Sequence, residues 1–199
     1  EIKQFSMRYP MSPGWILDGV NLHISAGERL ALVGPSGCGK STLARVILQL
    51  LPVGSFSKGH LLLNGIDPRK LDQARLRGLR GEAVGLVFQD PMIRLNPLMT
   101  IGSHLVDTLG AHLPGKTYEW RLKRSKELLE RVGISVKRFF AYPHELSGGM
   151  RQRLAIALAI ALKPALIIAD EPTTSLDMAI AHQVMLELKT LCEDIGSAL

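Results

Sequence analysis

The sequence contains few cysteines, few aromatic residues and no long apolar run. Its only cysteines are Cys38 and Cys192, and Cys38 lies inside a glycine-rich loop, where a disulfide would block a ligand. We therefore expect a reduced, cytosolic compartment. No apolar stretch approaches the roughly 18 residues that a membrane-spanning helix needs. No signal-peptide pattern opens the chain.

The composition is that of a folded protein with an excess of positive charge. The 199 residues are 46% hydrophobic and 21% charged, which fits one domain with a sub-domain and no disordered tract. The formal net charge is +6, and basic residues gather at residues 69–80 and 116–138. Such clusters can attract nucleic acid or an anionic membrane face. Leucines interleave these charges, so the pattern favours two solvated helical faces.

Short apolar and alternating segments predict an α/β core. Residues 29–33 form an apolar run that stops at Gly34, which is typical of a buried strand that leads into a glycine-rich loop. Asn64-Gly65 is a turn signal, and Pro52 ends a helical stretch. The expected elements are strands at residues 20–24, 29–33, 60–64, 84–88 and 166–169 and helices at residues 41–51 and 151–162. Strands that alternate with helices predict a largely parallel sheet.

Residues 89–146 differ from this pattern. Several proline and glycine breaks are followed by a helical run over residues 118–132. Leu122, Leu129 and Val132 fall on one face of that run, and charged residues occupy the others. We interpret residues 89–146 as a helical insert in the α/β core.

The glycine-rich loop has the spacing and the flanks of a phosphate-binding P-loop. Its residues are Gly34, Pro35, Ser36, Gly37, Cys38, Gly39, Lys40, Ser41 and Thr42. Glycines let successive N–H groups point at phosphate oxygens, and the following helix adds its positive end. Lys40 is expected to reach the β- and γ-phosphates, and the Ser41 hydroxyl to bind Mg²⁺. A glycine-rich turn that merely caps a helix is the alternative.

Asp170 and Glu171 follow an apolar strand, at the strand end where open α/β sheets bind ligands. Asp170 fits the role of holding Mg²⁺, and Glu171 is placed to polarise a water for attack on the γ-phosphate. Capping of the next element is the alternative, because residues 172–174 resemble a turn into a helix.

Ser147, Gly148 and Gly149 precede an alanine-rich helix. Ser147 can N-cap that helix, and two glycines leave free N–H groups at its positive end, which would make a second anion site. An N-cap with a flexible hinge explains the same three residues equally well.

In combination these motifs resemble the nucleotide-binding subunits of ATP-binding-cassette (ABC) transporters over nearly the whole length. The phosphate loop, Gln89, the Ser-Gly-Gly signature, Asp170-Glu171 and residues 175–177 occur in the family's order. Finer matches resemble the dipeptide, oligopeptide and nickel importers, and they lie at residues 88–92, 95–97, 142–153 and 169–177. The resemblance implies a P-loop NTPase (RecA-like) core with an N-terminal antiparallel β-subdomain. It places the core at residues 1–88 and 147–199 and the helical subdomain at residues 89–146.

The resemblance also implies roles for single residues. Tyr9 would stack on adenine, with ordinary packing as the alternative. Gln89 would contact Mg²⁺ and the attacking water, unless it is a satisfied loop amide. Ser147, Gly148 and Gly149 would bind the γ-phosphate of an ATP held by a second subunit. Asp177 would order the subunit interface, although an aspartate also suits a helix N-terminus.

The implied machine is an ATPase that binds ATP and Mg²⁺ and pairs head to tail with a second ABC subunit. The protein would lie at the cytoplasmic face of the inner membrane, where transmembrane permease subunits would contact residues 89–113. A solute-binding protein would take part indirectly. The family's switch histidine would lie beyond Leu199, so we expect weak or no hydrolysis from these 199 residues, which we interpret as a shortened form. One alternative is a soluble ABC ATPase that acts on nucleic acid, although the basic cluster at residues 69–80 lacks aromatic residues for base stacking. Another alternative is a P-loop kinase, which would need no Ser-Gly-Gly element.

Overall fold

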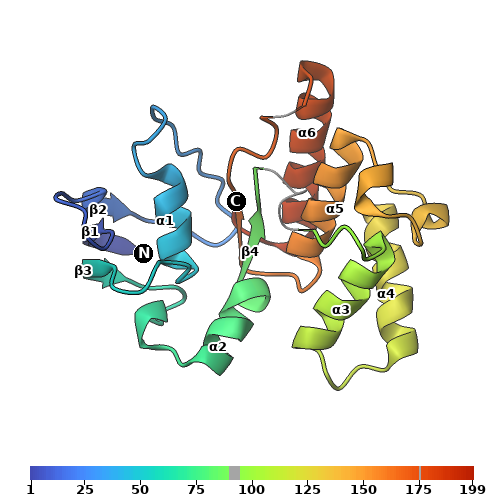
Figure 1. The fold of residues 1–199 in the computed structure, drawn as a ribbon, viewed down its shortest axis with the longest axis horizontal. Helices are drawn as coiled ribbons and strands as arrows, with labels where there is room; N and C mark the ends of the chain where they lie inside the picture. The colour runs from blue at the N-terminus through green and yellow to red at the C-terminus, as the bar shows by residue number, and fades with distance from the viewer. Residues whose placement is uncertain (90–94, 175) are drawn as a thin grey trace.

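The computed structural model describes residues 1–89, 95–174 and 176–199. Figure 1 shows three parts side by side: a small antiparallel sheet with one helix, a central pair of strands, and a group of helices. Within the described residues, no helix is both long and apolar enough to cross a membrane.

The antiparallel sheet has the order β2-β1-β3, with β1 at Ile2–Arg8, β2 at Leu17–Leu22 and β3 at Phe56–Leu61. Its inner face packs against helix α1, Lys40–Ile47, and buries Phe5 and Met7 completely. This is the antiparallel part that the family resemblance implies. Two predicted strands, 20–24 and 60–64, are present but both begin earlier in the chain, because the pairing with β1 decides their ends.

The predicted turn at Asn64-Gly65 is confirmed. Leu63 and Ile66 exchange two backbone hydrogen bonds of 2.8 and 2.9 Å, and the two residues between them have positive φ angles of 47° and 79°. Asparagine and glycine are the residues that this mirror-image hairpin turn requires.

The central strands are parallel, with β4 at Val84–Val87 and β5 at Leu166–Ala169 in the register Val84↔Leu166 to Val87↔Ala169. Both were predicted. Helix α5, Gly148–Ile160, packs on β4 so closely that a Cβ atom on Gly85 would lie 2.4 Å from the Ala159 carbonyl oxygen. The parallel register brings the carboxyl ends of β4 and β5 to the same edge.

Helices α3 (Ile101–His112), α4 (Tyr118–Arg131), α5 and α6 (Met178–Ile195) share the larger core. Of the three residues predicted to share one face of this run, Leu129 and Val132 are buried in and after α4, and Leu122 is partly buried. The sequence did not predict α3. The predicted alanine-rich helix is α5, which begins three residues earlier than residue 151.

The remaining elements are short. They are η1 at Pro68–Lys70, α2 at Gln73–Gly78, η2 at Leu79–Ala83, η4 at Val136–Arg138 and η5 at Pro143–Glu145. In the basic cluster, Arg75 and Arg77 are exposed, as expected of a solvated face. Arg80 instead donates hydrogen bonds of 2.9 and 2.7 Å to the Leu48 and Gln49 carbonyls at the end of α1.

The predicted buried strand at residues 29–33 is wrong. The segment has no regular structure, and Leu32 and Val33 are 50% and 90% exposed. A strand requires a partner along its length. Among the described residues, this segment's backbone pairs only with Leu199, through Leu30 and the preceding Glu28.

Candidate functional site

The phosphate loop runs from Gly34 into α1, as predicted. Gly39 occupies the N-cap position of α1 with φ of 101° and no side-chain cap, and Gly37 also has a positive φ of 81°. A Cβ atom on Gly39 would lie 2.8 Å from a Leu17 methyl group. The backbone N–H groups at the start of α1 are therefore left for an anion rather than for a capping side chain.

Lys40 is folded over this loop. Its Nζ donates hydrogen bonds of 2.8 and 2.9 Å to the Gly34 and Pro35 carbonyl oxygens and lies 3.9 Å from the Cys38 sulfur. Two neutral carbonyls hold the ammonium at the loop's mouth. A phosphate group would be a stronger partner for it because the hydrogen bond would then join opposite charges.

The loop and the acidic pair meet although they lie far apart in the sequence. The Ser41 hydroxyl donates a 3.0 Å hydrogen bond to Oδ1 of Asp170, across 129 residues. Asp170 is positioned because its own N–H donates to the Val87 carbonyl at the end of β4. A hydroxyl and a carboxylate side by side are the hard oxygen ligands that Mg²⁺ prefers, so these two residues fit the predicted metal role.

Glu171 receives two donors on one oxygen. Gln89 Nε2 and Thr174 Oγ1 donate to Oε2 of Glu171 over 3.0 and 3.1 Å. Glu171 itself has a φ of 46°, a left-handed conformation that costs roughly 1–2 kcal/mol for a residue with a side chain. Gln89 and Glu171, two predicted site residues, are thus brought together. Thr174 belongs to the same network, and no sequence pattern indicated its role.

Part of this site borders a cleft of about 470 Å³ that also reaches along α1 and β5. Lys40, Asp170 and Glu171 form its polar end, and mainly apolar side chains, together with Arg29, line the rest. Gln152, which is 2% exposed, supports the same edge by donating a 3.5 Å hydrogen bond to the Phe88 carbonyl. Sequence reasoning missed Gln152, although a glutamine among the apolar residues of a buried helix could have indicated it.

Tyr9 lies against the phosphate loop. Its hydroxyl is 3.2 Å from Oγ1 of Thr42, and its ring packs on the core beneath the antiparallel sheet. The structure therefore places Tyr9 beside the loop and shows the packing that was the alternative role. Stacking on adenine remains a prediction.

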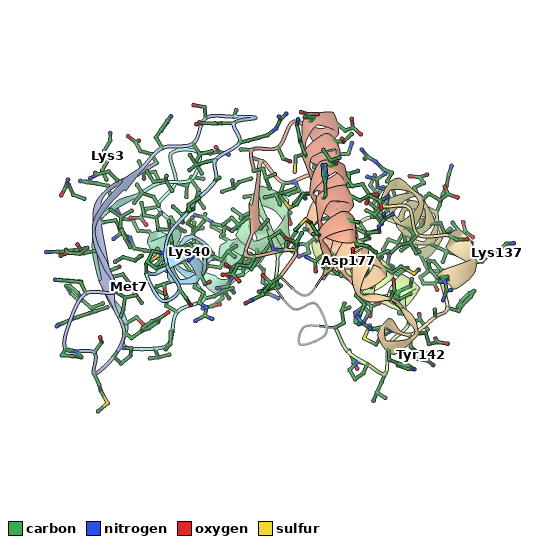
Figure 2. The ribbon with its side chains drawn as sticks, turned by 90° about the horizontal axis from the view of Figure 1, so that it is seen from above. Lys3, Met7, Lys40, Lys137, Tyr142 and Asp177 are labelled. Atoms are coloured by element: carbon green, nitrogen blue, oxygen red, sulfur yellow. The ribbon has the colours of Figure 1, made fainter. Side chains whose placement is uncertain are left out.

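Ser147 and Asp177 lie apart from the phosphate loop. Figure 2 places Asp177 at the start of α6 and Lys40 on the other side of the central strands. Within the described part of the chain, neither Ser147 nor Asp177 makes a hydrogen bond or an ion pair with residues 34–42. Both are N-caps: Ser147 accepts from the Met150 N–H over 3.3 Å, and Asp177 from the Ile180 N–H over 3.0 Å.

Some predicted motif residues lie outside the described residues. They are Asp90, Pro91, Met92 and Ser175.

Comparison with known proteins gives a consistent result. The family described as "ABC transporter" matches residues 17–174. The oligopeptide transport ATP-binding protein OppD of Bacillus subtilis is 42% identical over 205 residues, which cover the whole chain but only 57% of OppD. The chain thus spans little more than half of that relative.

Solved structures match the fold as well. The dimeric ATP-binding cassette MJ0796, in a post-hydrolysis state bound to ADP and Pi, matches with a TM-score of 0.82 and 33% sequence identity. The match covers 99% of this chain and 84% of the MJ0796 chain. CbiO1 from Clostridium perfringens, part of the transporter complex cbiONQ, matches with a TM-score of 0.74 and 28% sequence identity. This match covers 100% of this chain and 77% of the CbiO1 chain. The predicted P-loop NTPase fold class is therefore confirmed. The chain belongs to the ABC transporter family of ATP-binding proteins.

Proposed function

We propose that the chain is the ATP-binding and ATP-hydrolysing part of a subunit that energises the import of peptides. The observation that carries the proposal is the 3.0 Å contact between Ser41 and Asp170, because it joins a phosphate loop to an acidic pair at one strand edge. Residues 1–88 with 147–199 serve as the ATPase core, and residues 89–146 serve as the helical subdomain.

In this proposal, the N–H groups at the start of α1 and the Lys40 ammonium bind the phosphates of ATP. Ser41 and Asp170 hold Mg²⁺, with Gln89 as the third predicted ligand. When bound, the ion neutralises charge on the β- and γ-phosphates. Glu171 polarises the attacking water, and the donors on its carboxylate hold that carboxylate in place.

The other half of each site comes from a second ABC subunit, either the same chain or a different one. Ser147, Gly148 and Gly149 of one subunit complete the phosphate site of the other, and Asp177 lies at the interface between them. This is supported by the separation of Asp177 from Lys40 within one chain, which Figure 2 shows, and by the dimeric state named for MJ0796.

The subunit pair acts on transmembrane permease subunits at the cytoplasmic face of the membrane, with a solute-binding protein as the indirect partner. The complex named for CbiO1 supports an assembly of this kind. The relative OppD is named for oligopeptide transport, so we propose a peptide cargo rather than nickel. No observation favours a nucleic-acid partner.

The test uses the complete subunit. Lys40→Ala is expected to weaken ATP binding, measured by titration calorimetry, because the loop loses its only side-chain ammonium. Glu171→Gln is expected to keep ATP bound and trap a dimer while turnover falls on the order of 10²-fold. Lys70→Ala, at an exposed lysine outside the site, is the matched control. Unchanged ATP binding in Lys40→Ala would refute the proposal.

A further inference from the structure

The first turns of α5 and α6 pack against each other where the signature glycines lie. A Cβ atom placed on Gly149 would lie 2.8 Å from Cγ2 of Ile180, and one on Gly148 would lie 3.3 Å from a Leu176 methyl group. The first distance is shorter than side chains tolerate. Gly149 is buried and Ile180 is 37% exposed, so the contact lies at the edge of the protein interior.

Space, and not backbone conformation, demands glycine at residue 149. Gly149 lies within a helix and has no positive φ, so an alanine there would suit the backbone. The obstacle is Cγ2 of Ile180. That atom is attached directly to Cβ, and a β-branched side chain in a helix has essentially one χ1 rotamer, so Cγ2 cannot rotate away.

The same two turns carry Ser147 and Asp177. Ser147 caps α5, and Asp177 caps α6 by accepting a hydrogen bond from the Ile180 N–H. Ile180 is therefore hydrogen-bonded to Asp177 and also packed against Gly149, in the turn that follows Ser147. The separation of the two caps is therefore set by how closely residues 149 and 180 approach.

We propose that Ile180 is a positioning residue that acts through Gly149. Their contact holds Ser147 and Asp177 as one rigid unit, and that unit meets a nucleotide-loaded second subunit. The inference rests on the proposed function, because it needs Ser147 and Asp177 to act across a dimer. It adds a second role for Gly149, as the space into which α6 packs.

The test is a size-exchange series in the complete subunit. Gly149→Ala introduces the clash and is expected to weaken ATP-driven dimerisation about tenfold or more. Combining it with Ile180→Leu is expected to restore dimerisation, because leucine has a single γ-carbon and can leave the Cγ2 position vacant. Combining it with Ile180→Val is the matched control, which should not restore dimerisation because valine keeps both γ-carbons.

Dimerisation is measured by sedimentation with ATP in the Glu171→Gln background, and ATP binding by each variant is measured separately. The inference is overturned if leucine restores no more than valine does, or if Gly149→Ala dimerises normally. If Gly149→Ala is too unstable to purify, the melting temperatures of the two double variants are compared instead. A higher melting temperature with Ile180→Leu than with Ile180→Val supports the inference, and an equal or lower one overturns it. Failure of the proposed function would look different, since the parent Glu171→Gln subunit would then form no ATP-dependent dimer.

Discussion

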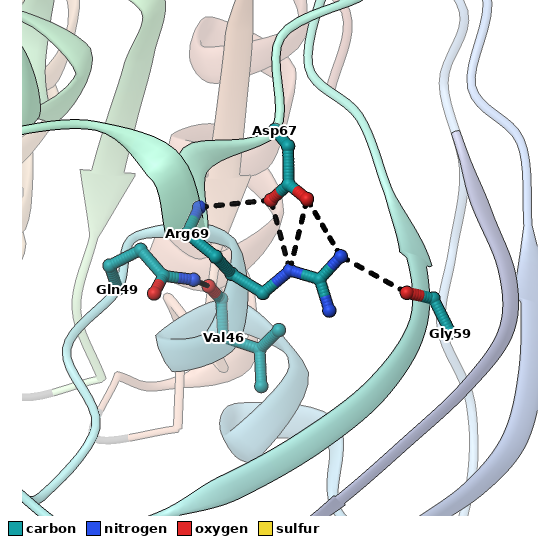
Figure 3. A network of polar contacts seen from close by, with 5 residues as sticks. All are labelled: Val46, Gln49, Gly59, Asp67 and Arg69. Atoms are coloured by element: carbon teal, nitrogen blue, oxygen red, sulfur yellow. Dashed lines mark hydrogen bonds and ion pairs between the residues drawn. The ribbon is translucent and has the colours of Figure 1, made fainter.

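The ion pair between Asp67 and Arg69 is expected to stabilise the fold, and Asp67→Asn measures by how much. Figure 3 shows the Arg69 guanidinium held between the Asp67 carboxylate and the Gly59 carbonyl of β3. Nε and Nη2 donate to the two carboxylate oxygens over 2.9 and 2.7 Å, and Nη2 also donates to Gly59 over 3.0 Å. Asparagine keeps an acceptor for the Arg69 N–H, but its amide group replaces one of the two oxygens that accept from the guanidinium, so the substitution removes the charge and one acceptor.

The magnitude follows from the burial of the pair. The side chains of Asp67 and Arg69 are 11% and 27% exposed, so solvent screens them less than a surface pair. A hydrogen bond to a charged group contributes about 1.5–3 kcal/mol, and asparagine retains part of one such bond. We therefore expect Asp67→Asn to lower the free energy of unfolding by about 1–2 kcal/mol at pH 7.

The loss should depend on pH in a defined direction. The side-chain hydrogen bond from Arg69 lowers the pKa of Asp67 below its usual value. A lowered pKa stabilises the fold fully above the unfolded value, about 3.9, and this contribution disappears as the pH falls through the folded value. The difference between wild type and Asp67→Asn should thus be constant between about pH 7 and pH 5 and shrink below about pH 4.

Urea unfolding followed by tryptophan fluorescence measures the loss of unfolding free energy and its dependence on pH. The control is Asp72→Asn, because Asp72 also caps a helix and faces an arginine, Arg75, at 3.9 Å, but these side chains are 66% and 76% exposed. We expect that control to change the unfolding free energy by less than about 0.5 kcal/mol. Equal losses for the two variants would show that burial of the Asp67 pair contributes nothing.

Three further experiments have defined outcomes. In the complete subunit, Thr174→Val removes a donor to Glu171 and should lower kcat about tenfold with little change in the KM for ATP, whereas Thr174→Ser should keep kcat. A valine variant as fast as wild type would contradict this role. Burial raises the pKa of Cys192 to about 11, so Ellman's reagent should label exposed Cys38 alone at pH 8, more slowly with ATP present, and label Cys192 only in urea. Arg80→Met removes two hydrogen bonds at the end of α1 and should lower the unfolding free energy by about 2 kcal/mol, with a correspondingly lower midpoint in urea than for wild type.

Local signals made the phosphate side of the site predictable. The glycine-rich turn at Gly39 and the start of α1 depend on residues close by in the sequence, and both appear where the motif spacing indicated. The meeting of Ser41 with Asp170 agrees with the Mg²⁺ roles predicted for both residues, although the segment before the phosphate loop is not a strand of the parallel pair.

Features that depend on distant partners were not predictable in the same way. The segment around Leu32 has the composition of a strand, yet strand formation requires a neighbouring backbone that the pattern does not reveal. Helix α3 contains Gly102 and Gly110, which lower helix propensity. A Cβ atom on Gly102 would lie 2.3 Å from the Phe139 ring, so tertiary packing explains a glycine that looks like a helix breaker.

The two N-caps show why a local role and an interface role need not compete. As caps, Ser147 and Asp177 each accept one hydrogen bond from a backbone N–H. A serine hydroxyl that accepts a bond still has its own hydrogen to donate, and a carboxylate has further lone pairs. The capping bond also restricts the side chain, so less conformational entropy is lost when a second subunit arrives. Finding that both residues cap helices therefore supports a preorganised interface, and it favours α6 and α5 meeting a partner as one surface.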